Sequence, residues 1–112
     1  MARFVRGNIV VVNFPFSDLT QFKKKPSLVL ENIAGRDMIF CQITSNSYES
    51  LEEVEINNTD FIEGKLKRKS YVRFTKLFTG DDSLINYKVG KINQEKLKQI
   101  ALKLSHFLSK NL

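Results

Sequence analysis

The sequence predicts a mainly β domain, either a small antiparallel barrel or a strongly curved sheet, with one helix at its C-terminal end. Several short apolar stretches rich in Val, Ile and Phe are separated by turn-forming residues, as strands in such a domain are. The last segment instead repeats its apolar residues at three- and four-residue steps, which is typical of a helix. With 112 residues, of which 42% are hydrophobic, the chain is expected to form a single domain over residues 1–112 and to bury a core.

Four strands are predicted in the first half of the chain. Val and Ile dominate the first, and the fourth alternates acidic and apolar residues as a half-exposed strand does. The loop from Pro15 to Lys25 spans about a dozen residues, near the upper end for a connection without structure, and such loops are often functional. Pro26 has no amide hydrogen, so it suits the first position of a strand or an edge. The four strands are Asn8–Asn13, Ser27–Leu30, Met38–Thr44 and Glu53–Ile56.

The second half of the chain is predicted to hold one further strand and the helix. Ser70–Phe74 has strand composition and is followed by Lys76–Phe78 and by a turn at Gly80–Ser83. Asn93 is a good N-cap for the helix. An apolar stripe along the helix is expected to pack on the core or in a dimer. It comprises Leu97, Ile100, Ala101, Leu104, Phe107 and Leu108.

Three features of the sequence favour a cytoplasmic protein with no membrane partner. No segment reaches the roughly 18 apolar residues that span a bilayer. Met1–Arg6 is too short and too soon interrupted to be a signal peptide. The single Cys41 lies in an apolar stretch, where we expect it to be buried, and one cysteine cannot form an intramolecular disulfide. That cysteine usage suits a reducing cytosol.

The net charge of +6 is unevenly distributed along the chain. Residues 49–63 contain acidic side chains and no basic one, whereas residues 64–76 contain basic side chains and no acidic one. A patch of one sign attracts a polyanion and raises its local concentration. The charge pattern therefore favours a nucleic-acid partner, although a basic face that only keeps the protein soluble fits the charge as well.

Several common catalytic arrangements are excluded by the residues present. His106 lies late in the predicted helix, and one His with one Cys cannot form a zinc-type ligand cluster. The glycines are scattered rather than gathered in a phosphate-binding loop. No paired-carboxylate motif occurs, since Asp81 and Asp82 lie in a turn-like sequence. We expect neither a metal nor a cofactor.

Two short motifs place phosphate-handling groups at strand ends. Lys25-Pro26-Ser27-Leu28-Val29-Leu30 follows the lysines 23 and 24, and Gln42-Ile43-Thr44-Ser45 ends an apolar strand. RNA carries its own nucleophile, the 2′-hydroxyl, so a protein can cleave it by positioning that hydroxyl, neutralising the phosphorane oxygens and protonating the leaving 5′-oxygen. Cationic and hydroxyl side chains are sufficient for those tasks.

In order and spacing, these motifs resemble the MazF/PemK toxins of bacterial toxin–antitoxin systems, which are small ribosome-independent endoribonucleases. The stretches Gly7–Leu19, Gly64–Arg73 and Thr75–Phe78 fit the same pattern. The resemblance implies an SH3-like barrel that forms a homodimer, with single-stranded mRNA crossing the dimer face. It further implies metal-independent cleavage that leaves a 2′,3′-cyclic phosphate and a 5′-hydroxyl, and a cognate antitoxin whose acidic, partly disordered segment covers the basic groove.

The resemblance also suggests roles for individual residues. Lys25 would act on the phosphate, at a position where the family typically has Arg, and Thr44 would stabilise the transition state. Arg73 would be a second phosphate ligand; Thr75 stands where some members carry a proton-transferring Asp. The loop aromatics Phe14, Phe16 and Phe22 could stack on bases or pack beneath the loop. The residues expected to bind RNA are Phe16, Asp18, Lys23, Lys24, Gln42, Ser45 and Lys69.

Two alternatives stay open at this point. The protein could be a weak or inactive member of the fold that binds RNA or an antitoxin, because Lys25 brings one point charge in place of the bidentate Arg fork. It could also be a gyrase poison of the related CcdB type. That activity depends on a C-terminal tail carrying Trp, whereas this chain has no Trp and ends in Lys110-Asn111-Leu112.

Overall fold

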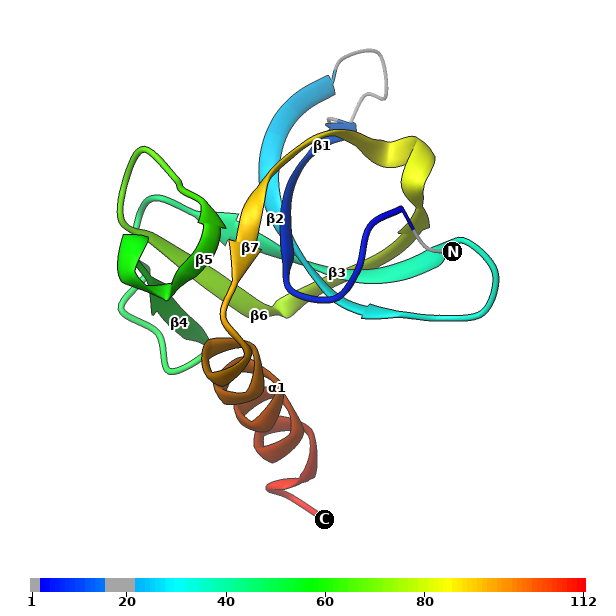
Figure 1. Ribbon diagram of the computed structural model, residues 1–112. Helices are drawn as coiled ribbons and strands as arrows, with labels where there is room; N and C mark the ends of the chain where they lie inside the picture. The colour runs from blue at the N-terminus through cyan, green and yellow to red at the C-terminus, as the bar shows by residue number, and fades with distance from the viewer. Residues whose placement is uncertain (1–2, 16–21) are drawn as a thin grey trace.

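The structure, a computed structural model, describes residues 3–15 and 22–112. One curled sheet and one long helix make up this part of the chain (Figure 1). The sheet has seven strands in the order β4-β6-β3-β2-β1-β7-β5, and every pair of neighbours is antiparallel. The elements are β1 (Asn8–Pro15), β2 (Phe22–Asn32), β3 (Asp37–Thr44), β4 (Glu53–Ile56), the 3₁₀ turn η1 (Asn58–Asp60), β5 (Phe61–Gly64), β6 (Ser70–Asp81), the 3₁₀ turn η2 (Asp82–Leu84), β7 (Ile85–Ile92) and α1 (Gln94–Ser109).

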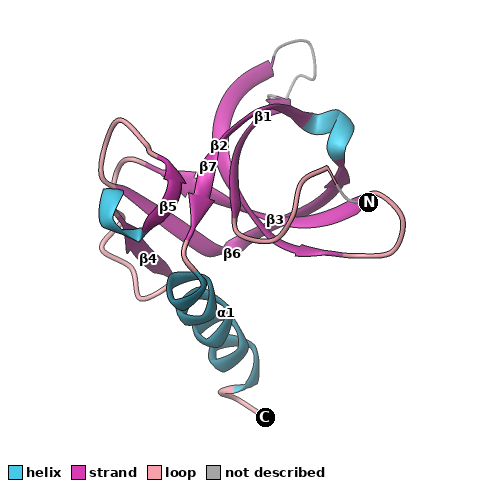
Figure 2. Cartoon of the chain, viewed as in Figure 1, coloured by secondary structure: helices cyan, strands magenta, loops and turns pink. Residues whose placement is uncertain are grey.

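The sheet curls into a half-barrel rather than closing. The edge strands β4 and β5 are not paired with each other, and α1 lies at one end of the sheet (Figure 2). The predicted fold class, a mainly β domain with a curved antiparallel sheet and a C-terminal helix, is therefore confirmed.

Both faces of the central strands are buried, and each face contributes to its own apolar cluster. Ile9 packs in one cluster, between the sheet and α1, whereas its neighbour Val10 packs in the other, within the curl. Phe40 lies in the second cluster and stacks on Phe78 with the ring centroids 4.8 Å apart. Full burial of each such side chain contributes about 1.5–3 kcal/mol, so the two clusters hold the curl in shape. Burial on two faces also explains why these strands have near-continuous apolar sequences.

The strands of the first half agree well with the sequence predictions. β3 and β4 match the predicted ranges to within one residue, and β1 extends the predicted strand to Pro15. The predicted Ser70–Phe74 strand and the stretch Lys76–Phe78 form one long strand, β6. The predicted turn at Gly80–Ser83 contains the start of η2.

Pro26 lies at an edge, one of the two positions predicted for it, rather than at the first position of a strand, and the expected loop from Pro15 to Lys25 is shorter than predicted. β2 begins at Phe22, so Pro26 lies inside the strand, where it pairs with Val11 of β1. Pairing of β2 with β3 starts only at Ser27. Because the side of β2 that faces away from β1 is unpaired at Pro26, the missing amide hydrogen leaves no gap in the ladder.

Two strands, β5 and β7, were not predicted. The pairing of β7 with β1 contains two register shifts, which break the alternation that would mark a strand in the sequence. β5 and β7 approach each other at a pair of glycines. A Cβ on Gly90 would lie 2.2 Å from the carbonyl oxygen of Glu63, and Gly64 has a φ of +69°. Only glycine suits this contact, since any side chain would collide with the backbone.

Helix α1 begins as predicted and buries only part of its apolar stripe. The Asn93 side chain accepts a hydrogen bond from the Lys96 amide at 2.7 Å. Leu97 and Ile100 are buried against the sheet, and Leu104 and Phe107 pack at the margin of the same cluster. The other stripe residues, Ala101 and Leu108, are exposed. No helix in the described part of the chain is long and apolar enough to cross a membrane.

Candidate active site

A hollow of about 370 Å³ lies where the ends of β2, β3 and β6 come together. The register explains why: Ser27 of β2 and Arg73 of β6 both pair with Gln42 of β3, on opposite sides. Because β2 and β6 both pair with β3 at Gln42, side chains of these two outer strands lie around the end of β3. The residues lining the hollow are Lys23, Lys24, Lys25, Pro26, Gln42, Ile43, Thr44, Ser45, Asn46, Tyr48, Ser70 and Arg73.

A bulge in β6 borders the hollow. Cys41 pairs with Leu77, but the next residue of β3, Gln42, pairs with Arg73, so Phe74–Lys76 are extra residues on β6. Such bulges bend a strand and re-aim its side chains, and they are frequent beside active sites. Below this bulge β6 also pairs with β4, through Ser70–Arg73. Arg73 is therefore held between two neighbouring strands.

Most of the predicted site residues line this hollow. The predicted catalytic residues Lys25, Thr44 and Arg73 are all there, together with the predicted RNA-binding residues Lys23, Lys24, Gln42 and Ser45. Lys69 is not among the lining residues, and its ammonium nitrogen lies 3.9 Å from a carboxylate oxygen of Glu55. Phe16 and Asp18 lie outside the residues that the structure describes.

The hollow combines positive charge with hydroxyl groups. Lys23 and Lys24 are exposed and Lys25 is half-buried, and among the described residues no carboxylate lies within ion-pairing distance of these three lysines. Thr44 ends β3, and its hydroxyl oxygen accepts a hydrogen bond from the Asn46 amide at 3.2 Å. Cations and hydroxyls at strand ends are the groups that a phosphodiester needs for binding and charge neutralisation.

Three acidic side chains of residues 49–63 pair with lysines that do not line the hollow, whereas Glu53 lies near Arg73. Glu55 faces Lys69, Asp60 lies 3.8 Å from the ammonium of Lys96, and Glu63 lies 2.5 Å from that of Lys88. These pairs offset positive charge away from the hollow. The three lysines of β2 are in none of these ion pairs, so their positive charge can attract a polyanion.

The structure adds Tyr48 and Glu53, which the sequence analysis did not select. The Arg73 guanidinium carbon lies 4.2 Å from the centroid of the Tyr48 ring. The Glu53 carboxylate accepts hydrogen bonds from the Ser47 hydroxyl and, at 3.1 Å, from the Tyr48 amide. These contacts depend on how the β3–β4 loop turns, and no spacing in the sequence marks them.

Hydrogen bonding sets the protonation of Glu53. Partial burial acts to raise its pKa, but the hydrogen bonds from Ser47 and from the Tyr48 and Ser50 amides, together with the charge of Arg73, outweigh burial. The pKa of Glu53 therefore lies below its ordinary value of 4.5. A carboxylate whose lone pairs are occupied in this way is a poor proton acceptor and a good anchor.

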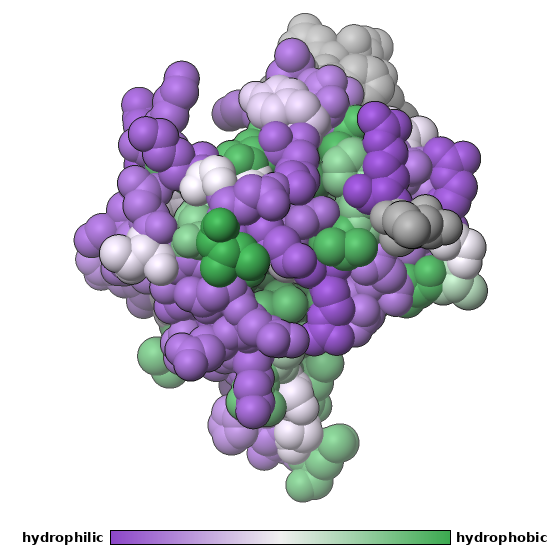
Figure 3. Space-filling model, viewed as in Figure 1, coloured by the Kyte–Doolittle hydropathy of each residue, from purple (hydrophilic) through white to green (hydrophobic). Residues whose placement is uncertain are grey.

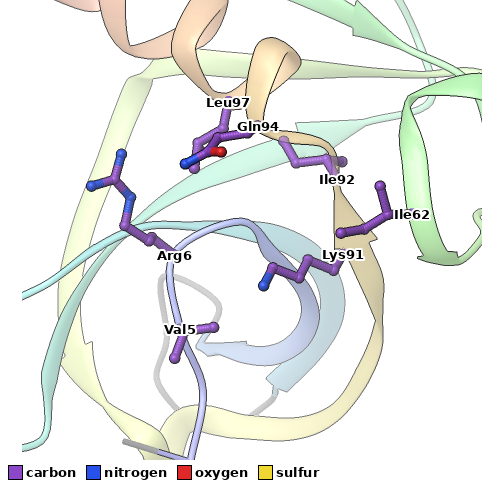
Figure 4. Close-up of a pocket in the computed structure, with 7 residues that line it drawn as sticks. All are labelled: Val5, Arg6, Ile62, Lys91, Ile92, Gln94 and Leu97. Atoms are coloured by element: carbon purple, nitrogen blue, oxygen red, sulfur yellow. The ribbon is translucent and has the colours of Figure 1, made fainter.

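A second hollow, near the start of α1, is less suited to phosphate chemistry. Figure 4 shows its lining residues, Val5, Arg6, Ile62, Lys91, Ile92, Gln94 and Leu97. It contains two cations but no hydroxyl side chain. Arg6 is already paired with Glu31 at 3.4 Å, and Figure 4 shows the charged ends of Arg6 and Lys91 pointing in different directions.

Comparison with known proteins decides the family. The model of the family described as PemK-like, MazF-like toxin of type II toxin–antitoxin system matches residues 5–108. The chain belongs to this family. The resemblance drawn from the strand-end motifs is thereby confirmed, and the hollow lies at those motifs in this toxin.

Several solved structures have a similar fold. A MazE–MazF crystal structure from Deinococcus radiodurans has a TM-score of 0.75 and 20% identity, covering 94% of this chain and 95% of that one. An endoribonuclease in complex with its cognate antitoxin, from a mycobacterial species, has a TM-score of 0.74 and 16% identity, covering 94% of both chains. The Mycobacterium tuberculosis toxin MazF-mt6 has a TM-score of 0.70 and 15% identity, covering 90% of this chain and 95% of that one. No curated protein sequence matches the chain.

Proposed function

We propose that this toxin is an endoribonuclease that cuts single-stranded RNA, mRNA in particular, in the hollow between β2, β3 and β6. The observation that carries the proposal is the meeting of Lys25, Thr44 and Arg73 around one hollow, although they lie far apart in sequence. Family membership supports it, as does the likeness in fold to structures named as endoribonucleases.

The reaction uses a nucleophile that the RNA supplies. The 2′-hydroxyl oxygen attacks the adjacent phosphorus and its proton passes to solvent water, the bond from phosphorus to the 5′-oxygen breaks, and the products carry a 2′,3′-cyclic phosphate and a 5′-hydroxyl. Lys25 and Arg73 neutralise charge that develops on the non-bridging oxygens, and the Thr44 hydroxyl donates a hydrogen bond to the same phosphate. The leaving 5′-oxygen needs a proton, for which the Lys25 ammonium is the candidate donor. This scheme routes no step through a metal or a cofactor.

The same charges suit the partner of a toxin. We propose that a cognate antitoxin with an acidic segment covers the hollow, since Lys23, Lys24 and Lys25 would attract carboxylates as they attract phosphates. Solved complexes of similar fold contain a toxin with its antitoxin. We place this toxin in the cytoplasm, where mRNA is translated and where its single buried Cys41 stays reduced.

We further propose that the toxin is a homodimer. The hydrophilic face in Figure 3 carries apolar patches, one of them at the far end of α1. There Leu108 is 65% exposed, and Leu104, Leu108 and Leu112 line an apolar hollow with Leu30. A domain of this size gains core by pairing.

The deciding experiment is incubation of purified protein with a mixed-sequence single-stranded RNA in EDTA, followed by mapping of the cut sites. A second RNA carries one 2′-deoxy residue at the mapped site. We expect the first RNA to be cut and the second to resist at that position. Cleavage of the deoxy RNA, or a strict need for magnesium, would show that the 2′-hydroxyl scheme is wrong.

A further inference from the structure

Tyr48 presents an aromatic surface beside the hollow. One face of its ring is covered by the Arg73 guanidinium, whose central carbon lies 4.2 Å from the ring centroid. The residue is nevertheless 60% exposed, and it lines the hollow with Thr44 and Lys25. Since Arg73 covers one face of the ring and the residue is largely exposed, the rest of the Tyr48 ring faces solvent.

The position of this ring is fixed by the loop that carries it. Glu53 receives hydrogen bonds from the Ser47 hydroxyl and the Tyr48 amide, which ties the β3–β4 loop to the start of β4. Glu53 is also the register partner of Arg73 across the β4–β6 pair. Glu53 therefore holds the loop that carries Tyr48, and its neighbour across the strand pair, Arg73, is the cation that the Tyr48 ring covers. This attachment holds the Tyr48 ring over Arg73.

We propose that Tyr48 is a base-stacking residue of the RNA site, receiving the base of a nucleotide whose phosphate contacts Arg73. This inference rests on the proposed function and adds to it a residue that holds a base. The N–H groups of a guanidinium lie in its own plane, so stacking on Tyr48 leaves them available to a phosphate. The Tyr48 ring and the Arg73 guanidinium are in contact. A single nucleotide can therefore place its base on the ring and its phosphate on the guanidinium. Stacking on an aromatic side chain is how proteins hold splayed single-stranded bases.

The binding test uses the RNA that the wild-type protein cuts, made resistant by a 2′-deoxy residue at the cut site. Tyr48→Ala should weaken its binding between about 5- and 150-fold, the range for loss of one stacked base. Tyr48→Phe should bind like wild type, because the ring and not the hydroxyl is required. Tyr87→Ala is the matched control, since Tyr87 is 54% exposed and lies outside the hollow, and it should leave binding unchanged.

A second set of RNAs tests the stacking contact itself. In each RNA one nucleotide near the cut site lacks its base. At the position that stacks, loss of the base should weaken wild-type binding and leave Tyr48→Ala binding almost unaffected, because the two changes remove one contact. The chain has no Trp, so the tryptophan of a Tyr48→Trp variant is a unique reporter, and bound RNA should quench its fluorescence. A Tyr87→Trp variant should show no such quenching.

The outcomes separate this inference from the proposed function. Wild-type protein that neither binds nor cuts RNA would overturn the proposed function, and the role of Tyr48 with it. Wild-type protein that cuts RNA while Tyr48→Ala binds equally well, with no abasic position at which the two proteins converge, would overturn the role of Tyr48 alone. Weak binding by Tyr48→Phe would also overturn it, since the hydroxyl and not the ring would then be the contact.

Discussion

Glu53 and Arg73 are register partners on β4 and β6, so their side chains project from the same face of the sheet. Their charges influence each other, yet each side chain has a further partner: Glu53 holds the β3–β4 loop, and Arg73 lies under Tyr48. The pair links the loop to the hollow.

The first prediction concerns phosphate contact by Arg73. Affinity for single-stranded RNA should fall with salt by about 0.7 log unit per log unit of salt for each phosphate contact. Arg73→Ala should therefore flatten the log–log slope by roughly one contact, measured on cleavage-resistant RNA. Arg36→Ala is the control, because Arg36 is paired with Asp82 outside the hollow and its loss should leave the slope as it is. An unchanged slope in Arg73→Ala would place Arg73 off the RNA path.

The second prediction concerns Glu53 and pH. Its pKa in the folded protein is below the ordinary value of 4.5, so ionised Glu53 stabilises the fold at pH values above 4.5. That contribution is lost as pH falls through the lower, folded pKa. In urea unfolding, the free energy of unfolding of the wild type should therefore fall over this acidic range, and that of Glu53→Gln should fall less.

The matched control for Glu53 is Glu49→Gln, which removes one charge from the same loop. The Glu49 side chain makes neither of the two hydrogen bonds that Glu53 accepts from Ser47 and Tyr48. The Glu49→Gln variant should therefore lose as much folding stability at acidic pH as the wild type does. Equal pH profiles for Glu53→Gln and wild type would mean that the anchor is unimportant.

The third prediction concerns the replacement of the family's Arg by Lys25. If Lys25 supports catalysis, the wild-type protein cuts RNA without any substitution at this position. A site that has lost cleavage would instead bind RNA or antitoxin without cutting, and Lys25→Arg would restore cleavage by returning the bidentate fork. We expect cleavage by the wild type, measured on the RNA that maps the cut sites.

The fourth prediction concerns assembly. The protein should sediment as a homodimer at micromolar concentration, because a small domain gains buried surface by pairing. A monomer of 13.0 kDa at every accessible concentration would contradict this expectation.

How much the sequence predicts differs between the fold and the site. Strands buried on both faces, such as β1 and β3, are visible as apolar runs, whereas β7 is hidden by its register shifts and by Lys88 and Lys91. Most of the predicted site residues line one hollow because they end strands that neighbour each other. Tyr48 could not be predicted, since its place over Arg73 depends on hydrogen bonds within a loop.

The central claim is that the hollow between β2, β3 and β6 cuts RNA, and single-turnover cleavage by Lys25→Ala tests it most directly. Loss of an electrostatic group that acts in the transition state typically lowers the rate about 10²-fold or more, which is the result we predict. Thr44→Ala should also slow cleavage, and the double variant should lose less than the sum of the two free-energy changes, because both groups act on one phosphate. Lys98→Ala, on the exposed side of α1, should cut like wild type. Cleavage by Lys25→Ala at the wild-type rate would contradict the account.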